Sequence, residues 1–175
     1  MLFYEYEICT NETIKKLWEV INNTTPEQWT RPPDNKIEYR IRITADIFNG
    51  NPKTEALITK FVEPHRLFIQ RLEPRTSYNW HLDWARNASL TLCLNQTENS
   101  LTLFAERKEE NHFCELRPLY YKPNTMYLFN GSRWHCGINY SDETRYLISI
   151  SLTRPATIDS AVDFLNQHRE IKEIR

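Results

Sequence analysis

Apolar residues recur at helical spacing in three parts of the chain. Each part begins at residues suited to a helix N-terminus, namely Thr10 or Asn11, then Asn51 followed by Pro52, and finally Thr157. The apolar residues that share one face are Ile14, Leu17, Trp18 and Ile21 in the first part, Leu57, Ile58 and Phe61 in the second, and Ile158, Ala161, Val162 and Leu165 in the third. This spacing predicts three amphipathic helices, each with one buried face.

Between residues 65 and 152 the helical spacing gives way to short runs of strand-forming residues, about ten residues apart. The clearest run has Leu90, Leu92 and Leu94 alternating with smaller or polar residues, which is the period of a strand. The runs lie near Leu67–Glu73, Trp80–Trp84, Ala88–Asn95, Leu101–Glu106, His112–Arg117, Thr125–Phe129, Trp134–Asn139 and Arg145–Leu152. Such spacing is typical of a β-sandwich or barrel, so we predict a mainly β fold with flanking helices.

The chain outside these runs forms two flanks. Residues 1–64 contain the first two helices, a proline-containing connection over Thr24–Lys36 and an additional strand, Ile37–Ile43, in which apolar and polar residues alternate. Residues 153–175 contain the last helix. A chain of 175 residues is close to the size of one domain, so we expect a single domain around the core of residues 65–152. The additional strand either extends the core sheet or pairs with another chain, and the oligomeric state is not predicted.

Charge and composition narrow the function classes. The 22 basic and 23 acidic residues give a formal net charge of −1, so no basic excess exists to neutralise phosphates and a nucleic-acid partner is disfavoured. No apolar run approaches the roughly 20 residues of a membrane helix. The segment MLFYEYEIC lacks the features of a secretory signal, so we expect a cytoplasmic protein without a membrane segment. The four cysteines include no Cys-x-x-Cys pair, which argues against a cysteine zinc site.

The spacing of His81, Asp83, His135 and Arg145 indicates a metal site. His81 and Asp83 are two apart, so on a strand they would point to one face and could bind one divalent ion, although a strand-end histidine bonded to a nearby carboxylate has the same sequence. His135 follows about fifty residues later and Arg145 about ten beyond it, at the starts of neighbouring predicted strands. Two histidines and one carboxylate leave open metal positions, as in non-haem Fe(II) enzymes, and a buried arginine binds carboxylates.

This motif resembles that of the Fe(II)- and 2-oxoglutarate-dependent dioxygenases, which have a double-stranded β-helix core of the jelly-roll, cupin-like type. The resemblance covers residues 67–152 and implies that His81, Asp83 and His135 are the iron ligands. It also implies that Arg145 binds the distal carboxylate of 2-oxoglutarate. The preceding elements are most similar to the branch of aspartyl/asparaginyl β-hydroxylases and free-proline hydroxylases. Aspartyl β-hydroxylases lack the carboxylate ligand and related halogenases replace it, so Asp83 favours a hydroxylase with a complete triad.

The resemblance implies an oxidoreductase that hydroxylates an unactivated C–H bond with Fe(II) as metal and 2-oxoglutarate as cosubstrate. The expected substrate is an amino acid, a peptidyl residue or another small polar molecule, recognised by the segments of residues 24–35 and 73–79. The alternative is a cupin-like module that binds a metal or a small molecule without oxidative chemistry. Arg145 distinguishes the two, because a module that holds only a metal needs no carboxylate-binding arginine. Nucleobase dealkylation by the same chemistry is a third possibility.

Three more polar residues are candidates for binding the cosubstrate. Tyr78 and Arg86 flank the His-x-Asp pair, where each is either a cosubstrate or substrate contact or a residue of the rim. Ser149 is four residues after Arg145 on the same strand face. Its hydroxyl either adds to the cosubstrate site or bonds to the backbone.

Three tryptophans lie next to the candidate ligands in the sequence. Strand alternation directs Trp80 and Trp134 away from the ligands, so we assign them to packing of the core or sheet. We take Trp84 as a candidate for the wall of the pocket.

Overall fold

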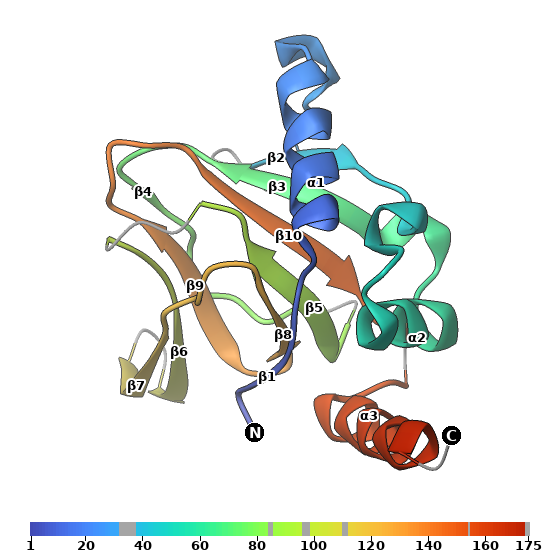
Figure 1. Ribbon diagram of the computed structural model, residues 1–175. Helices are drawn as coiled ribbons and strands as arrows, with labels where there is room; N and C mark the ends of the chain where they lie inside the picture. The colour runs from blue at the N-terminus through green and yellow to red at the C-terminus, as the bar shows by residue number, and fades with distance from the viewer. Residues whose placement is uncertain (32–37, 84–85, 96–98, 110–111, 154, 174–175) are drawn as a thin grey trace.

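The computed structural model describes residues 1–31, 38–83, 86–95, 99–109, 112–153 and 155–173 (Figure 1). Its strands are β1 (Phe3–Ile8), β2 (Glu38–Arg42), β3 (Leu67–Leu72), β4 (Thr76–Ser77), β5 (Ala88–Cys93), β6 (Ser100–Glu109), β7 (His112–Leu119), β8 (Thr125–Asn130), β9 (Trp134–Asn139) and β10 (Arg145–Ser151). Its helices are α1 (Asn11–Asn23), α2 (Pro52–Phe61) and α3 (Ile158–Glu173), with short 3₁₀ turns at η1 (Pro26–Gln28), η2 (Ala45–Phe48) and η3 (Pro64–Arg66). The predicted mainly β fold with flanking helices is confirmed.

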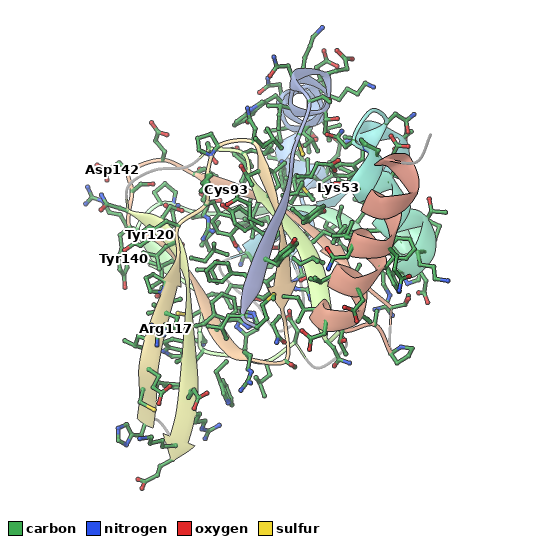
Figure 2. All side chains as sticks on the ribbon, turned by 60° about the horizontal axis from the view of Figure 1, so that its bottom comes forward. Lys53, Cys93, Arg117, Tyr120, Tyr140 and Asp142 are labelled. Carbon is green, nitrogen blue, oxygen red and sulfur yellow. The ribbon has the colours of Figure 1, made fainter. Side chains whose placement is uncertain are left out.

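The strands form two antiparallel sheets. The larger sheet has the order β1-β8-β5-β10-β3-β2 and the smaller has the order β4-β9-β6-β7. From β3 onward the chain alternates between them if the hairpin of β6 and β7 is taken as one unit: β3, β5, β8 and β10 lie in the larger sheet, and β4, the hairpin and β9 lie in the smaller. This alternation winds the two sheets around a common interior. Figure 2 shows the hairpin of β6 and β7, with Arg117, projecting beyond the other strands.

The main hydrophobic core lies on the outer face of the larger sheet. Alternate residues of its strands point outward, among them Leu90 and Leu92 of β5 and Ile148 and Ile150 of β10, all completely buried. The three helices lie on this side of the sheet (Figure 1) and contribute the apolar faces that their spacing predicts. Since apolar area buried in this way is the main stabilising contribution to folding, the outer face holds the fold together.

The inner face of the same strands has a different character. A second, smaller hydrophobic cluster fills part of the interior and consists of Cys93, Phe104, Leu119, Tyr121, Tyr127 and Phe129. Elsewhere the inward residues are polar and buried, as with Thr91, Arg145 and Ser149. Buried polar groups are costly unless they are paired, so a polar interior indicates a binding site.

The helix starts follow the expected capping residues with one difference. Thr10 accepts a hydrogen bond from Thr13 N at the start of α1, and Thr157 Oγ1 accepts one from Ser160 N at the start of α3. At α2, Asn51 makes no capping bond. The carboxylate of Glu7 instead accepts hydrogen bonds from Lys53 N and Thr54 N, so β1 satisfies the helix N-terminus.

Two parts of the strand prediction are wrong. Strand β1 was not predicted, although Tyr4, Tyr6 and Ile8 alternate with Glu5 and Glu7; it pairs with β8 at the edge of the larger sheet. The run Trp80–Trp84 is not a strand over the residues described there, which make only a single bridge between His81 and His135. A nearby two-residue strand, β4, pairs with β9 instead.

Strand β2 extends the larger sheet. It pairs with β3 over the register Glu38↔Leu72 to Arg42↔Phe68, which resolves the question of where the additional strand lies. Ile37, the first residue of the predicted strand, is outside the described residues. The apolar residues Tyr39 and Ile41 pack against the main core.

Within the part of the chain that the structure describes, no helix is both long enough and apolar enough to cross a bilayer.

Candidate metal centre and cosubstrate pocket

Backbone hydrogen bonds hold His81 and Asp83 in place although their segment is not a regular strand. His81 N donates to His135 O and His135 N donates to His81 O, both at 3.0 Å. Asp83 N donates to Gly131 O at 2.8 Å, in the turn between β8 and β9. The two histidines are therefore direct cross-strand neighbours, and the carboxylate is brought to them by the adjoining turn.

The three side chains form one cluster of ligand atoms. His81 Nε2 lies 3.9 Å from Asp83 Oδ1, and His135 Nε2 lies 3.9 Å from Asp83 Oδ2. One ligand atom from each residue lies within 4.8 Å of the others. These separations suit three ligands on one side of a single divalent ion, which leaves the opposite side for other molecules.

Hydrogen bonds to the backbone fix the histidine tautomers. His81 Nδ1 lies 2.8 Å from Asn79 O, and His135 Nδ1 lies 2.7 Å from Arg133 O. A carbonyl oxygen only accepts, so each Nδ1 carries the proton and donates it. In the neutral form of each ring, Nε2 then has its lone pair free beside Asp83, which is the arrangement of histidines that bind a metal.

The charges around the cluster favour the metal-binding protonation states. Burial and, to a smaller extent, the neighbouring His81 outweigh the opposing effect of Asp83 and lower the pKa of His135 to about 4, so His135 is neutral at pH 7. Burial raises the pKa of Asp83, but Arg86 and the two histidines outweigh burial and leave it below its ordinary value. The carboxylate is therefore ionised and the imidazole unprotonated, as ligands must be.

Arg86 holds the carboxylate from behind. Its Nε donates to Asp83 Oδ2 at 2.7 Å and its Nη2 to Asp83 Oδ1 at 3.3 Å, a two-point contact that fixes the plane of the carboxylate. Its Nη1 donates to Ser149 Oγ at 3.1 Å and to Ser151 Oγ at 2.7 Å on β10. Arg86 thus links Asp83 to Ser149 and Ser151 in one hydrogen-bond network.

Arg145 is buried with unused hydrogen-bond donors. Its side chain starts at β10, is 2% exposed, and lies over the ring of Tyr121 at 5.2 Å. Nη1 donates to Leu101 O at 3.0 Å and to Ile138 O at 3.3 Å. Nε and Nη2 are buried and have no hydrogen-bond partner among the described residues. A buried cation with two such donors is costly unless an anion binds there, and their fork matches a carboxylate.

A single cavity connects the metal cluster to Arg145. It has a volume of about 140 Å³ and its lining includes His81, Asp83, His135 and Arg145. The backbone of Gly137, two residues after His135, forms part of the lining next to Arg145. The site therefore offers a metal position and a carboxylate position within one cavity.

The other predicted residues lie at the same cavity or pack behind it. Tyr78 lines the cavity, its backbone N donates to Gly137 O, and its ring lies 4.6 Å from the ring of His81. Arg86 and Ser149 also line it. Trp80 stacks on Phe113 at 4.5 Å, so its predicted packing role is confirmed.

Trp134 also has the packing role predicted for it. Trp134 packs edge-on against Phe113 at 5.5 Å, as its predicted role requires. Trp84 lies outside the described residues.

Sequence reasoning missed one side of the cavity. Glu38 and Arg40 of β2 and Gln70 of β3 line it, and Arg40 Nε donates to Glu38 Oε1. Burial lowers the pKa of Arg40, but Glu38 and, at longer range, Asp83 outweigh burial and leave it above its ordinary value. The available signal was the alternation along Ile37–Ile43, in which the polar positions form a face of their own.

Comparison with known proteins identifies the fold. No family model and no curated protein matches the sequence. Among solved structures, the HygX structure from Streptomyces hygroscopicus with nickel, 2-oxoglutarate and hygromycin B bound matches with a TM-score of 0.61 at 9% identity, over 89% of this chain and 84% of HygX. A Pseudomonas putida prolyl-4-hydroxylase matches with a TM-score of 0.59 at 12% identity, over 87% of this chain and 93% of the hydroxylase.

EvdMO1 matches with a TM-score of 0.57 at 17% identity, over 89% of this chain, and the chain spans 48% of the length of EvdMO1. At sequence identities this low, the structural matches establish a shared architecture and no more. The chain has the double-stranded β-helix fold of these proteins. In this double-stranded β-helix, the cavity lies between the two sheets; His135 comes from β9 of the smaller sheet, Arg145 from β10 of the larger sheet, and His81 and Asp83 from the segment bridged to β9.

Proposed function

We propose that the protein is an Fe(II)- and 2-oxoglutarate-dependent oxygenase that hydroxylates a C–H bond of an amino acid, a peptidyl residue or another small polar substrate. The observation that carries this proposal is the joint presence, in one cavity, of the cluster His81, Asp83 and His135 and of the unpaired donors of Arg145. A site for a metal alone would not explain why the Arg145 guanidinium is buried with unpaired donors.

The residues fit both groups that the reaction needs. Two histidines and one carboxylate are a ligand set of Fe(II) oxygenases, and they leave positions for a chelating cosubstrate and for oxygen. Arg145 Nε and Nη2 would bind the distal carboxylate of 2-oxoglutarate. The structural neighbours support this proposal, since HygX has been solved with nickel and 2-oxoglutarate bound.

Fe(II) and 2-oxoglutarate, when bound, supply oxidising chemistry coupled to the conversion of 2-oxoglutarate into succinate and carbon dioxide. The chain supplies the geometry and the environment. His81, Asp83 and His135 would hold the metal on one side, and Arg145 would orient the cosubstrate. The enclosing sheets would limit the access of water to the reacting groups.

Three further residues would support this arrangement. We propose that Tyr78 contacts the cosubstrate from the wall of the cavity, beside His81. Arg86 would act through Asp83, since its donors already bind that carboxylate and Ser149. It is a positioning residue for the metal ligand, and Ser149 in turn positions Arg86.

An anaerobic titration of the purified protein with Fe(II) and 2-oxoglutarate tests the proposal. We expect a weak visible charge-transfer band, which reports 2-oxoglutarate chelated to Fe(II). His81→Ala should abolish the band by removing a ligand. Arg145→Ala should weaken 2-oxoglutarate binding by about thirtyfold or more, because a buried charge pair is lost, while metal binding persists.

Exposed residues of the same types provide matched controls. His65→Ala and Arg75→Ala remove an exposed histidine and an exposed arginine whose ion pairs, with Glu63 and Asp142, lie on the surface. Both variants should retain the band. Metal binding by the wild type without any affinity for 2-oxoglutarate would reject the oxygenase and favour a metal-binding module.

A further inference from the structure

The side of the cavity formed by β2 and β3 carries charges that the proposed chemistry does not use. Glu38 and Arg40 are two residues apart on β2 and face inward, while Tyr39 and Ile41 face the main core. Through the strand register, Glu38 lies in line with Leu72 and Arg145, and Arg40 in line with Gln70 and Leu147. The pair therefore lies on the same inner surface as the carboxylate-binding arginine, two strands away.

Glu38 is buried and Arg40 is partly buried, and removing these charges from water costs free energy. The side chain of Glu38 is 7% exposed and that of Arg40 31% exposed. A buried ion pair is often no more stabilising than apolar residues of similar size, so stability alone does not account for it. Their contact involves Arg40 Nε, one of the five donors of a guanidinium. An inner wall with both signs of charge suits a ligand that also has both.

The other charged groups of the cavity already have assignments. Arg86 binds Asp83, and Arg145 would bind 2-oxoglutarate under the proposed function. Neither Glu38 nor Arg40 forms an ion pair with the metal-ligand cluster. The cavity of about 140 Å³ must also accommodate the cosubstrate, so only a small molecule or one end of a larger one fits beside it.

We propose that Glu38 and Arg40, with Gln70 beside them, form the substrate subsite and that the substrate is a free α-amino acid or a similar small zwitterion. The carboxylate of the substrate binds Arg40, its ammonium group binds Glu38, and Gln70 offers a neutral hydrogen-bonding amide. This inference rests on the proposed function. A peptidyl residue, which has neither charge at its backbone, does not match this wall.

The test measures succinate release and the mass of the oxygenated product with the Fe(II)-loaded protein and 2-oxoglutarate. The free L-amino acids are screened first. The best substrate is then compared with its N-acetyl derivative, its amide and its N-acetyl amide, which lack the ammonium, the carboxylate and both. We expect KM to rise about tenfold or more for each charge removed, because a partly buried charge then loses its partner.

Variants link each charge of the substrate to one residue. Arg40→Gln should raise KM for the free amino acid by about tenfold or more but should have little effect on the amide, which has no carboxylate. Glu38→Gln should raise KM for the free amino acid and have little effect on the N-acetyl derivative. Arg42→Gln is the matched control, because Arg42 is exposed on the same strand beyond the residues that line the cavity, and its KM should equal that of the wild type.

The outcomes separate this inference from the function on which it rests. If the wild type binds Fe(II) and 2-oxoglutarate but no free amino acid stimulates succinate release, the zwitterion subsite is rejected and the oxygenase stands. Equal turnover of the free amino acid and its N-acetyl amide would reject it as well. If the wild type does not bind 2-oxoglutarate, the proposed function itself fails. Binding of 2-oxoglutarate by each variant without substrate, together with its thermal melting, shows whether a variant has lost its fold.

Discussion

Gly131 allows the chain to pass close to the carboxylate of the metal cluster. A Cβ atom at this position would lie 2.7 Å from Asp83 Oδ2 and 2.9 Å from Asp83 Cβ. Real side chains essentially never approach this closely, and Gly131 O also accepts the hydrogen bond from Asp83 N. The absence of a side chain at residue 131 is therefore part of the geometry of the site.

Gly131→Ala should displace Asp83 and weaken metal binding by about tenfold or more, at a cost of about 1–3 kcal/mol in stability from overpacking. A titration with Fe(II) or Mn(II), followed by calorimetry, measures the affinity. Gly137→Ala is the control, since a Cβ there meets only ordinary contacts of 3.8 Å or more. Wild-type metal affinity in Gly131→Ala would contradict the assignment of Asp83 as a ligand.

Arg86 provides a second prediction at the level of single residues. Arg86→Gln removes the two-point contact to Asp83 and leaves the carboxylate free to rotate. Metal affinity should fall by about ten- to a hundredfold, as is usual when a partner of a metal ligand is lost. Arg133→Gln, which removes an exposed arginine paired with Glu106 at 3.8 Å, should leave the affinity unchanged. Equal affinities in the two variants would argue against a positioning role.

At the scale of elements, β1 links the barrel to the helical layer. Glu7 on β1 accepts hydrogen bonds from Lys53 N, Thr54 N and Thr54 Oγ1 at the start of α2. Glu7→Ala should lower the free energy of unfolding by about 1 kcal/mol or somewhat more, because the helix N-terminus loses its acceptor. Urea unfolding measures this change. Glu5→Ala removes a carboxylate in an exposed pair with Lys122 and should cost less than about 0.5 kcal/mol.

Elements with a strong period were predictable, and those defined by long-range pairing were not. Helix α1 and strand β5 follow from the spacing of apolar residues alone. Strand β1 depends on β8, more than a hundred residues later, and no local pattern encodes that partner. The segment around His81 is held by two reciprocal hydrogen bonds with His135 on β9 and by one from Asp83 to Gly131, so its His-x-Asp spacing was recognisable while its backbone form was not.

In the site, too, some features were predictable from the sequence and others were not. The clustering of His81, Asp83 and His135 and the burial of Arg145 were predictable, because metal and carboxylate chemistry constrain both residue type and spacing. The contact of Arg86 with Asp83 was not predictable, since it depends on the side-chain directions of two residues that belong to no helix or strand. Glu38 and Arg40 were missed because the side of the sheet on which a strand adds its polar face is a tertiary property.

At the scale of the whole molecule, binding at the cavity should stabilise the fold. A ligand that binds only the folded chain at a hundred times its Kd adds about 2.7 kcal/mol. For a chain of this size, Fe(II) or Mn(II) with 2-oxoglutarate should therefore raise Tm by about 5–10 °C over the metal-free protein in EDTA. Differential scanning fluorimetry measures the shift. Arg145→Ala should keep the increment from the metal and lose the increment from 2-oxoglutarate, and equal increments in the two proteins would contradict the role of Arg145.

The two faces of the larger sheet have different roles: the outer face packs against the helices and stabilises the fold, and the inner face lines the cavity. Apolar side chains such as Ile148 and Ile150 face the helices, whereas Ser149 on the same strand faces the cavity. Selection can therefore alter the inward residues while the outward ones preserve folding. A library that varies positions 38, 40 and 70 together should contain many folded members, which makes this wall of the barrel a starting point for engineering new substrate preferences.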